Sequence, residues 1–191
     1  MKDNPEFIVI TGPMFSSKTT ELFTLVQKCT HRHKKFAAFK PSIDNRYGID
    51  NITSHDGLEI PAMRVKDGSD ILEFIFEGDD SYDIVVVDEA FMIPNVAKAL
   101  KLLFSYGYSI YVATLDLSAT GKNFREVNAM LPWATKIEKR TAVCSVCSQD
   151  ANYSYKRSSF SNSDSDIEVG GAEEYEARCF SCHPRINERD K

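Results

Sequence analysis

The stretch that decides the fold is FIVITGPMFSSKTTELF, residues 7 to 23. Its first four residues are apolar and predict a buried parallel strand, and the stretch from Lys18 to about His33 predicts a helix. The turn between them matches G-x-x-x-x-G-K-[ST] at every defined position except Ser17. A strand, loop and helix in this order aim several backbone N–H groups at one anion. We therefore expect the turn to bind the phosphates of ATP, through Gly12, Pro13, Met14, Phe15, Ser16, Ser17, Lys18 and Thr19.

Three positions of this loop carry specific expectations. Lys18 is expected to meet the β- and γ-phosphates, and the Thr19 hydroxyl to bind Mg²⁺. Ser17 keeps the N–H donor of the usual glycine but adds a Cβ, at a cost of about 1 kcal/mol if the loop needs a left-handed backbone. The plainer alternative is an ordinary serine-rich turn before a helix.

A second apolar run, Ile84 to Val87, ends in two carboxylates. A carboxylate at the end of a neighbouring strand is the usual partner of a phosphate loop, so Asp88 is expected to bind Mg²⁺ directly or through water. Glu89 is expected to lie on the other side of the strand end and to accept the proton of an attacking hydroxyl or water. An exposed acidic strand terminus is the alternative.

The rest of the first 140 residues alternates strands with helices. Strands are predicted at 36–39 and 110–113, and helices near 69–77 and 94–106. A turn-rich segment between Arg46 and Val65 is interpreted as an excursion or β-hairpin. The pattern predicts an α/β fold with a parallel sheet of the P-loop NTPase type, flanked by helices.

Four of the five cysteines form two C-x-x-C pairs separated by 31 residues. Such pairs favour a closed structural Zn²⁺ site, with the ligands Cys144, Cys147, Cys179 and Cys182. His183 could replace one cysteine, and a redox dithiol is a further alternative. We expect residues 1–140 to form the nucleotide-binding domain and residues 141–191 a small zinc-binding lobe with an inserted loop.

Composition narrows the class of protein. The chain has 191 residues and a formal net charge of -5, which disfavours a broad nucleic-acid-binding surface. No signal peptide and no membrane-spanning run is seen, and paired cysteines in this pattern suit a reducing compartment. We expect a soluble, cytoplasmic protein that binds neither membranes nor nucleic acid.

Several motifs recur in one family in this order. They are GPMFSSKTTELF at 12–23, DNRY at 44–47, SHD at 54–56, VVVDEAF at 85–91, TLD at 114–116, TAVCSVC at 141–147 and IEVGGAEEYEARC at 167–179. On these motifs, over nearly its whole length, the chain resembles thymidine kinases of the cellular type. The resemblance implies transfer of the ATP γ-phosphoryl group to the 5′-hydroxyl of thymidine with Mg²⁺, and Glu89 as the base.

The resemblance also implies roles for individual residues. A loop of the zinc lobe, the lasso, closes over the nucleoside, and the implied substrate-binding residues are Met14, Ala119, Phe124, Ser154, Glu168, Val169, Gly170 and Tyr175. Besides the phosphate loop, the implied ATP-binding residues are Asp44, Arg46, Asp88 and Phe91. Family members are usually homotetramers and are commonly inhibited by thymidine triphosphate.

The chain departs from the family pattern at three positions. Ser17 replaces the loop glycine, Phe91 stands where a glutamine is usual, and Ala119 stands where an aromatic ring stacks on thymine. Loss of that ring weakens base binding by about 1 kcal/mol or more unless another ring compensates, and Phe91 is our candidate. The alternatives are a kinase with another nucleoside preference, a zinc-ribbon ATPase acting on nucleic acid, and a nucleotide-binding protein without catalysis.

Overall fold

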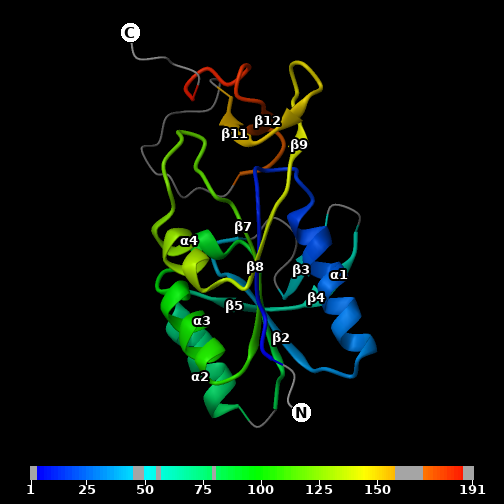
Figure 1. Ribbon diagram of the computed structural model, residues 1–191, viewed down its shortest axis with the longest axis vertical. Coiled ribbons are helices and arrows are strands. Elements are labelled where there is room, and N and C mark those ends of the chain that lie inside the picture. Colours follow the sequence, from blue (N-terminus) through cyan, green and yellow to red (C-terminus); the bar gives the residue numbers. More distant parts are fainter. Residues whose placement is uncertain (1–3, 45–49, 55–56, 79–80, 158–169, 187–191) are drawn as a thin grey trace.

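A six-stranded parallel sheet forms the centre of the protein (Figure 1). The computed structural model describes residues 4–44, 50–54, 57–78, 81–157 and 170–186. The sheet order is β5-β2-β6-β7-β1-β8, and each neighbouring pair runs parallel. All six carboxyl ends therefore meet at one edge. The strands are β1 (Phe7–Thr11), β2 (Phe36–Pro41), β5 (Met63–Val65), β6 (Ile84–Val87), β7 (Ser109–Thr114) and β8 (Lys136–Lys139).

Helices cover both faces of the sheet, which confirms the predicted α/β class. On one face α1 (Lys18–His31) packs Leu22 and Val26 against Ile8 and Ile10 of β1. On the other face, Phe7 and the strand residues that point to the same side of the sheet pack against three helices. These are α2 (Gly68–Glu77), α3 (Val96–Ser105) and α4 (Arg125–Met130), accompanied by the 3-10 turns η1 (Ala90–Met92) and η2 (Leu131–Trp133). None of the helices in the described ranges combines the length and the apolar content needed to cross a bilayer.

Two edge strands differ from the sequence prediction. A hairpin does form in the turn-rich segment, from β3 (Asn51–Thr53) and β4 (Glu59–Pro61). The following β5, however, joins the main sheet in parallel beside β2. At the opposite edge β8 was not predicted, because its sequence KIEK is polar and three of its four residues are exposed. The other four strands, β1, β2, β6 and β7, were predicted because a buried parallel strand gives a continuous apolar run.

A small lobe lies beyond the carboxyl edge of the sheet (Figure 1). It contains two antiparallel pairs, one of β9 (Ala142–Val143) with β10 (Asp150–Ala151) and one of β11 (Tyr153–Lys156) with β12 (Tyr175–Arg178). It begins three residues after β8 ends, close to the boundary predicted at 141. The polar tract at 158–166 lies outside the described residues. The lobe is therefore placed directly above the loops that follow the central strands.

Candidate active site

The loop after β1 is shaped by close backbone contacts. Gly12 has φ +143°, and a Cβ there would lie 2.3 Å from the Arg140 carbonyl oxygen, so only glycine fits. The Pro13 carbonyl accepts hydrogen bonds from Lys18 Nζ at 2.7 Å and from Ser16 Oγ at 2.8 Å. Ser17 adopts the left-handed conformation, with φ 56° and ψ 33°. The missing glycine is thus replaced by a residue held in the conformation that glycine favours.

The acidic end of β6 meets this loop. Thr19 Oγ1, in the first turn of α1, donates to Asp88 Oδ2 at 3.1 Å, although β7 separates β6 from the β1 strand that leads to the loop. Asp88 is buried, and desolvation together with the Glu89 charge raises its pKa to about 7. The hydrogen bonds from the Glu89 N–H and from Thr19, and the charge of Lys18, act in the opposite direction. Ligand oxygens on one Mg²⁺ lie about 3 Å apart, so the Thr19 and Asp88 oxygens fit such an ion.

A cleft of about 820 Å³, including open space, lies over the phosphate loop. It is lined by Met14 to Thr20 of the loop and by Asp88 and Glu89 after β6. Lys40, Asp44 and residues of β3 also line it. The buried Lys40 donates to the Asn51 carbonyl oxygen at 2.7 Å. The lining therefore combines two lysines and an N–H-rich loop with the carboxyl groups of Asp44, Asp88 and Glu89, which suits a triphosphate with a divalent cation.

A second, smaller cavity, of about 400 Å³ including open space, shares lining residues with the first. Its apolar side contains Phe91 and Phe124, whose ring centroids are 4.6 Å apart. The lobe contributes Ser154, Gly170 and Tyr175. Gly170 lies directly against the Tyr175 ring, where a Cβ would come within 2.4 Å of a ring carbon. An aromatic slot of this kind with a few polar groups suits a planar base.

Glu89 lines both cavities, together with Met14 and Leu115. It has a left-handed backbone, with φ 50° and ψ 40°, at the turn from β6 into η1. Such strain in a non-glycine residue is concentrated at functional sites. Asp88 lines only the first cavity. Asp88 thus borders the phosphate cleft alone, whereas Glu89 borders both cavities. This is the arrangement expected for a metal ligand beside a base.

The structure brings together most of the residues expected at the site. Gly12 and Pro13 are outside the cleft lining and shape the loop. Phe91, which carried an implied ATP role and was also the candidate to compensate for the missing ring, lines the second cavity together with Phe124 and Ala119. Three expected residues lie outside the described ranges, namely Arg46, Glu168 and Val169.

Several lining residues were missed by the sequence analysis. The only signal for Lys40 is a charged side chain inside an apolar strand. Leu115 and Ser118 lie in the segment after β7, which carried a family motif but no assigned role. The missed residues are Thr20, Lys40, Asn51, Ile52, Thr53, Met92, Leu115, Ser118 and Gly171.

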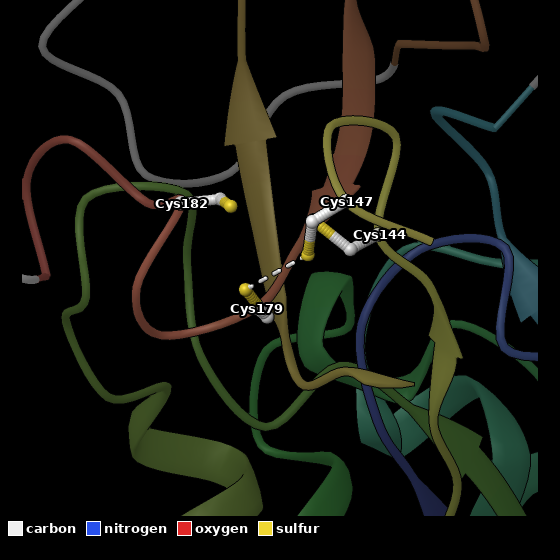
Figure 2. A group of neighbouring side chains, drawn as sticks. All are labelled: Cys144, Cys147, Cys179 and Cys182. Atoms are coloured by element: carbon white, nitrogen blue, oxygen red, sulfur yellow. Dashed lines mark hydrogen bonds between the residues drawn. The ribbon is translucent and has the colours of Figure 1, made fainter. Parts of the chain in front are cut away.

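The four paired cysteines come together in the small lobe (Figure 2). Their sulfur atoms all lie within 4.8 Å of one another, and Cys147 and Cys179 are 3.6 Å apart. A tetrahedral Zn²⁺ with Zn–S bonds near 2.3 Å requires sulfur separations of about 3.8 Å. His183 is not a fifth candidate, because Nε2 faces the Ser154 carbonyl oxygen and Nδ1 accepts from the backbone N–H groups of Arg185 and Ile186. The four thiols therefore fit the predicted closed site.

The raised pKa of Asp88 has a consequence for stability. An unfolded aspartate loses its proton near pH 4, whereas folded Asp88 loses it near 7. Between these values the native state binds more protons, so its free energy of unfolding falls as the pH rises. In ligand-free protein without Mg²⁺, the stability of wild type relative to Asp88→Asn should fall by more than about 1 kcal/mol from pH 4.5 to 7.5. Urea unfolding of wild type and Asp88→Asn at both pH values measures this change. The exposed Asp150→Asn is the control. A stability difference between wild type and Asp88→Asn that does not depend on pH would contradict the prediction.

Metal analysis tests the cysteine cluster. One zinc per chain is expected, and Cys147→Ser should lower the content and speed hydrogen exchange in β11 and β12 while β1 and β6 stay protected. Cys29→Ser is the matched control, because Cys29 lies in α1, outside the cluster. Wild-type protein purified without zinc, or full zinc content in Cys147→Ser, would contradict the assignment.

Comparison with known proteins agrees with this geometry. The model of the thymidine kinase family matches residues 6–183. A relative from Pseudothermotoga lettingae, named thymidine kinase, is 36% identical over 180 residues, which cover 93% of this chain and 94% of the relative. A match of this extent includes the phosphate loop, the acidic strand end and all four clustered cysteines. The chain belongs to the thymidine kinase family and is an ATP-dependent phosphotransferase.

Proposed function

We propose that this protein transfers the γ-phosphoryl group of ATP to the 5′-hydroxyl of thymidine. The observation that carries the proposal is the position of Glu89 in the wall shared by the phosphate cleft and the aromatic cavity. A nucleoside whose base occupies the aromatic cavity extends its sugar toward the phosphate loop past this carboxylate. Family membership and the identity to a protein named thymidine kinase support thymidine as the acceptor.

The first cavity holds the donor in this proposal. The N–H groups of residues 15 to 19 bind the β- and γ-phosphates, and Lys18 exchanges the Pro13 carbonyl for a phosphate oxygen. Mg²⁺ held by Thr19 and Asp88 would neutralise charge on the phosphates. Metal binding requires the carboxylate form of Asp88. A bound cation would therefore lower the Asp88 pKa, whereas desolvation raises it.

Glu89 acts on the acceptor. As the 5′-oxygen forms its bond to the γ-phosphorus, the bond to the β,γ-bridging oxygen breaks and ADP leaves with the bonding electrons. The Glu89 carboxylate accepts the proton of the 5′-hydroxyl. Closure of the lobe loops over the cavity would exclude water, which would otherwise compete as the acceptor.

Recognition of the base is assigned to the second cavity. Phe91 and Phe124 provide the aromatic surface, and Met14, Ser154, Gly170 and Tyr175 line the remaining sides. Ala119 also lines this cavity, so the position that lacks the family's stacking ring faces the same space as Phe91. Phe91 compensates for that ring in our proposal. The same observation favours, as a second candidate, a deoxynucleoside kinase with another base preference.

Other expectations from the sequence and from the resemblance stay predictions. They include roles for Arg46 at the phosphates and for Glu168 and Val169 at the base. They also include a homotetramer, inhibition by thymidine triphosphate, a cytoplasmic location and the division into domains at residues 140 and 141.

A labelled-ATP assay with a panel of nucleosides tests the function. Label in thymidine monophosphate is expected, and Glu89→Gln should lower kcat by about 10²- to 10⁴-fold because the general base is lost. ATP affinity should change by less than about twofold, since the loop is intact. The exposed Glu73→Gln is the matched control.

The other outcomes separate the alternatives. Label mainly in another nucleoside monophosphate supports the second candidate. Phosphate release stimulated by DNA, or ATP binding without transfer to any nucleoside, contradicts a nucleoside kinase. Undiminished transfer by Glu89→Gln contradicts the role of Glu89.

A further inference from the structure

His183 is a fully buried side chain next to the last cysteine of the cluster, and the proposed mechanism gives it no role. Its ring packs edge-on against two tyrosines of β11. The centroid distances are 6.0 Å to Tyr153, at 71°, and 5.5 Å to Tyr155, at 88°. Alternate residues of a strand point to the same face, so these rings lie on one face of β11 and Ser154 points to the other. His183 therefore fixes β11 from the face away from the phosphate loop.

Hydrogen bonds define the tautomer of His183. Nδ1 accepts from the N–H of Arg185 at 3.3 Å and of Ile186 at 3.1 Å, so it carries no proton. The proton of the neutral ring is then on Nε2, which donates to the Ser154 carbonyl oxygen at 3.1 Å. The ring thus joins the chain after the last cysteine to the middle residue of β11.

Ser154 continues the connection into the phosphate loop. Its side chain is buried, and Oγ accepts a hydrogen bond from the Met14 N–H at 3.0 Å. Met14 lines both cavities, and Ser154 lines the second. β11 also pairs with β12, where Lys156 lies opposite Tyr175, another residue of the second cavity. A displacement of β11 would therefore move three lining residues of that cavity together, namely Met14, Ser154 and Tyr175.

We propose that His183 is a positioning residue that holds Ser154 against Met14, and so sets the shape of the nucleoside cavity from within the zinc-binding lobe. The inference rests on the proposed function in assigning that cavity to the nucleoside. Lys18 bonds to the Pro13 carbonyl and Thr19 bonds to Asp88, so these two hydrogen bonds do not depend on Ser154. Loss of the His183 contact should therefore weaken nucleoside binding and leave ATP binding and the chemical step nearly unchanged.

Two conservative variants separate the hydrogen bonds of His183. His183→Gln keeps an N–H group at the reach of Nε2, whereas His183→Asn keeps an acceptor near the Arg185 and Ile186 N–H groups but does not reach Ser154. His183→Asn should raise the KM for the nucleoside about tenfold, the size of one lost hydrogen bond. Its kcat and its KM for ATP should stay within about twofold of wild type. His183→Gln should recover most of the nucleoside affinity, and exposed His31→Asn is the control.

Hydrogen exchange of the Met14 amide gives a readout that needs no reaction. In full-length, zinc-loaded protein without ligands, exchange at Met14 should speed up about tenfold in His183→Asn and less in His183→Gln. Ser154→Ala should speed it up directly, and His183→Asn should add little in that background. This readout stands even if the protein phosphorylates no nucleoside, so failure of the proposed function is distinguished from failure of the inference.

Three results would overturn the inference. They are unchanged Met14 exchange in folded His183→Asn, equal effects of the Asn and Gln variants, and additive effects of His183→Asn and Ser154→Ala. If His183→Asn fails to fold, Ser154→Ala and His183→Gln decide. If the Met14 amide of Ser154→Ala exchanges as slowly as that of wild type, the connection from His183 through Ser154 to Met14 is rejected.

Discussion

The parallel direction of six strands is the constraint on which the rest of the structure depends. It brings the loop after β1 and the acidic end of β6 to one edge, where Thr19 donates a hydrogen bond to Asp88 across the end of β7. Burial at this edge raises the Asp88 pKa, because desolvation and the neighbouring Glu89 charge disfavour the carboxylate form. A site with these properties favours a divalent cation and a polyphosphate, and Glu89 at the next position faces the neighbouring cavity.

The small lobe adds a second cavity at this edge of the sheet. Four clustered cysteines fix the base of the lobe, and β11 reaches down to the phosphate loop through Ser154 and Met14. The lobe thereby supplies one side of the second cavity, while η1 and the loop before α4 supply the aromatic side. Two chain segments far apart in the sequence thus form a single cavity next to the phosphates.

Much of this arrangement was predictable from the sequence, and the misses have physical causes. Buried parallel strands such as Ile84 to Val87 give continuous apolar runs, and C-x-x-C pairs specify a metal site by spacing alone, so both were found. The edge strand β8 is polar because one side faces solvent. The resemblance implied an ATP role for Phe91, and Phe91 was also our candidate for the missing ring; it follows the left-handed turn at Glu89 and lines the second cavity. The buried His183 gave no periodic signal, because its role depends on contacts with residues about 30 positions away.

A crystal structure with thymidine and a non-hydrolysable ATP analogue tests the central claim most directly. We expect the triphosphate on residues 12 to 19, the base in the second cavity against Phe91 and Phe124, and the Glu89 carboxylate within hydrogen-bonding distance of the 5′-hydroxyl. A base bound outside the second cavity, or a 5′-hydroxyl directed away from Glu89, would contradict it.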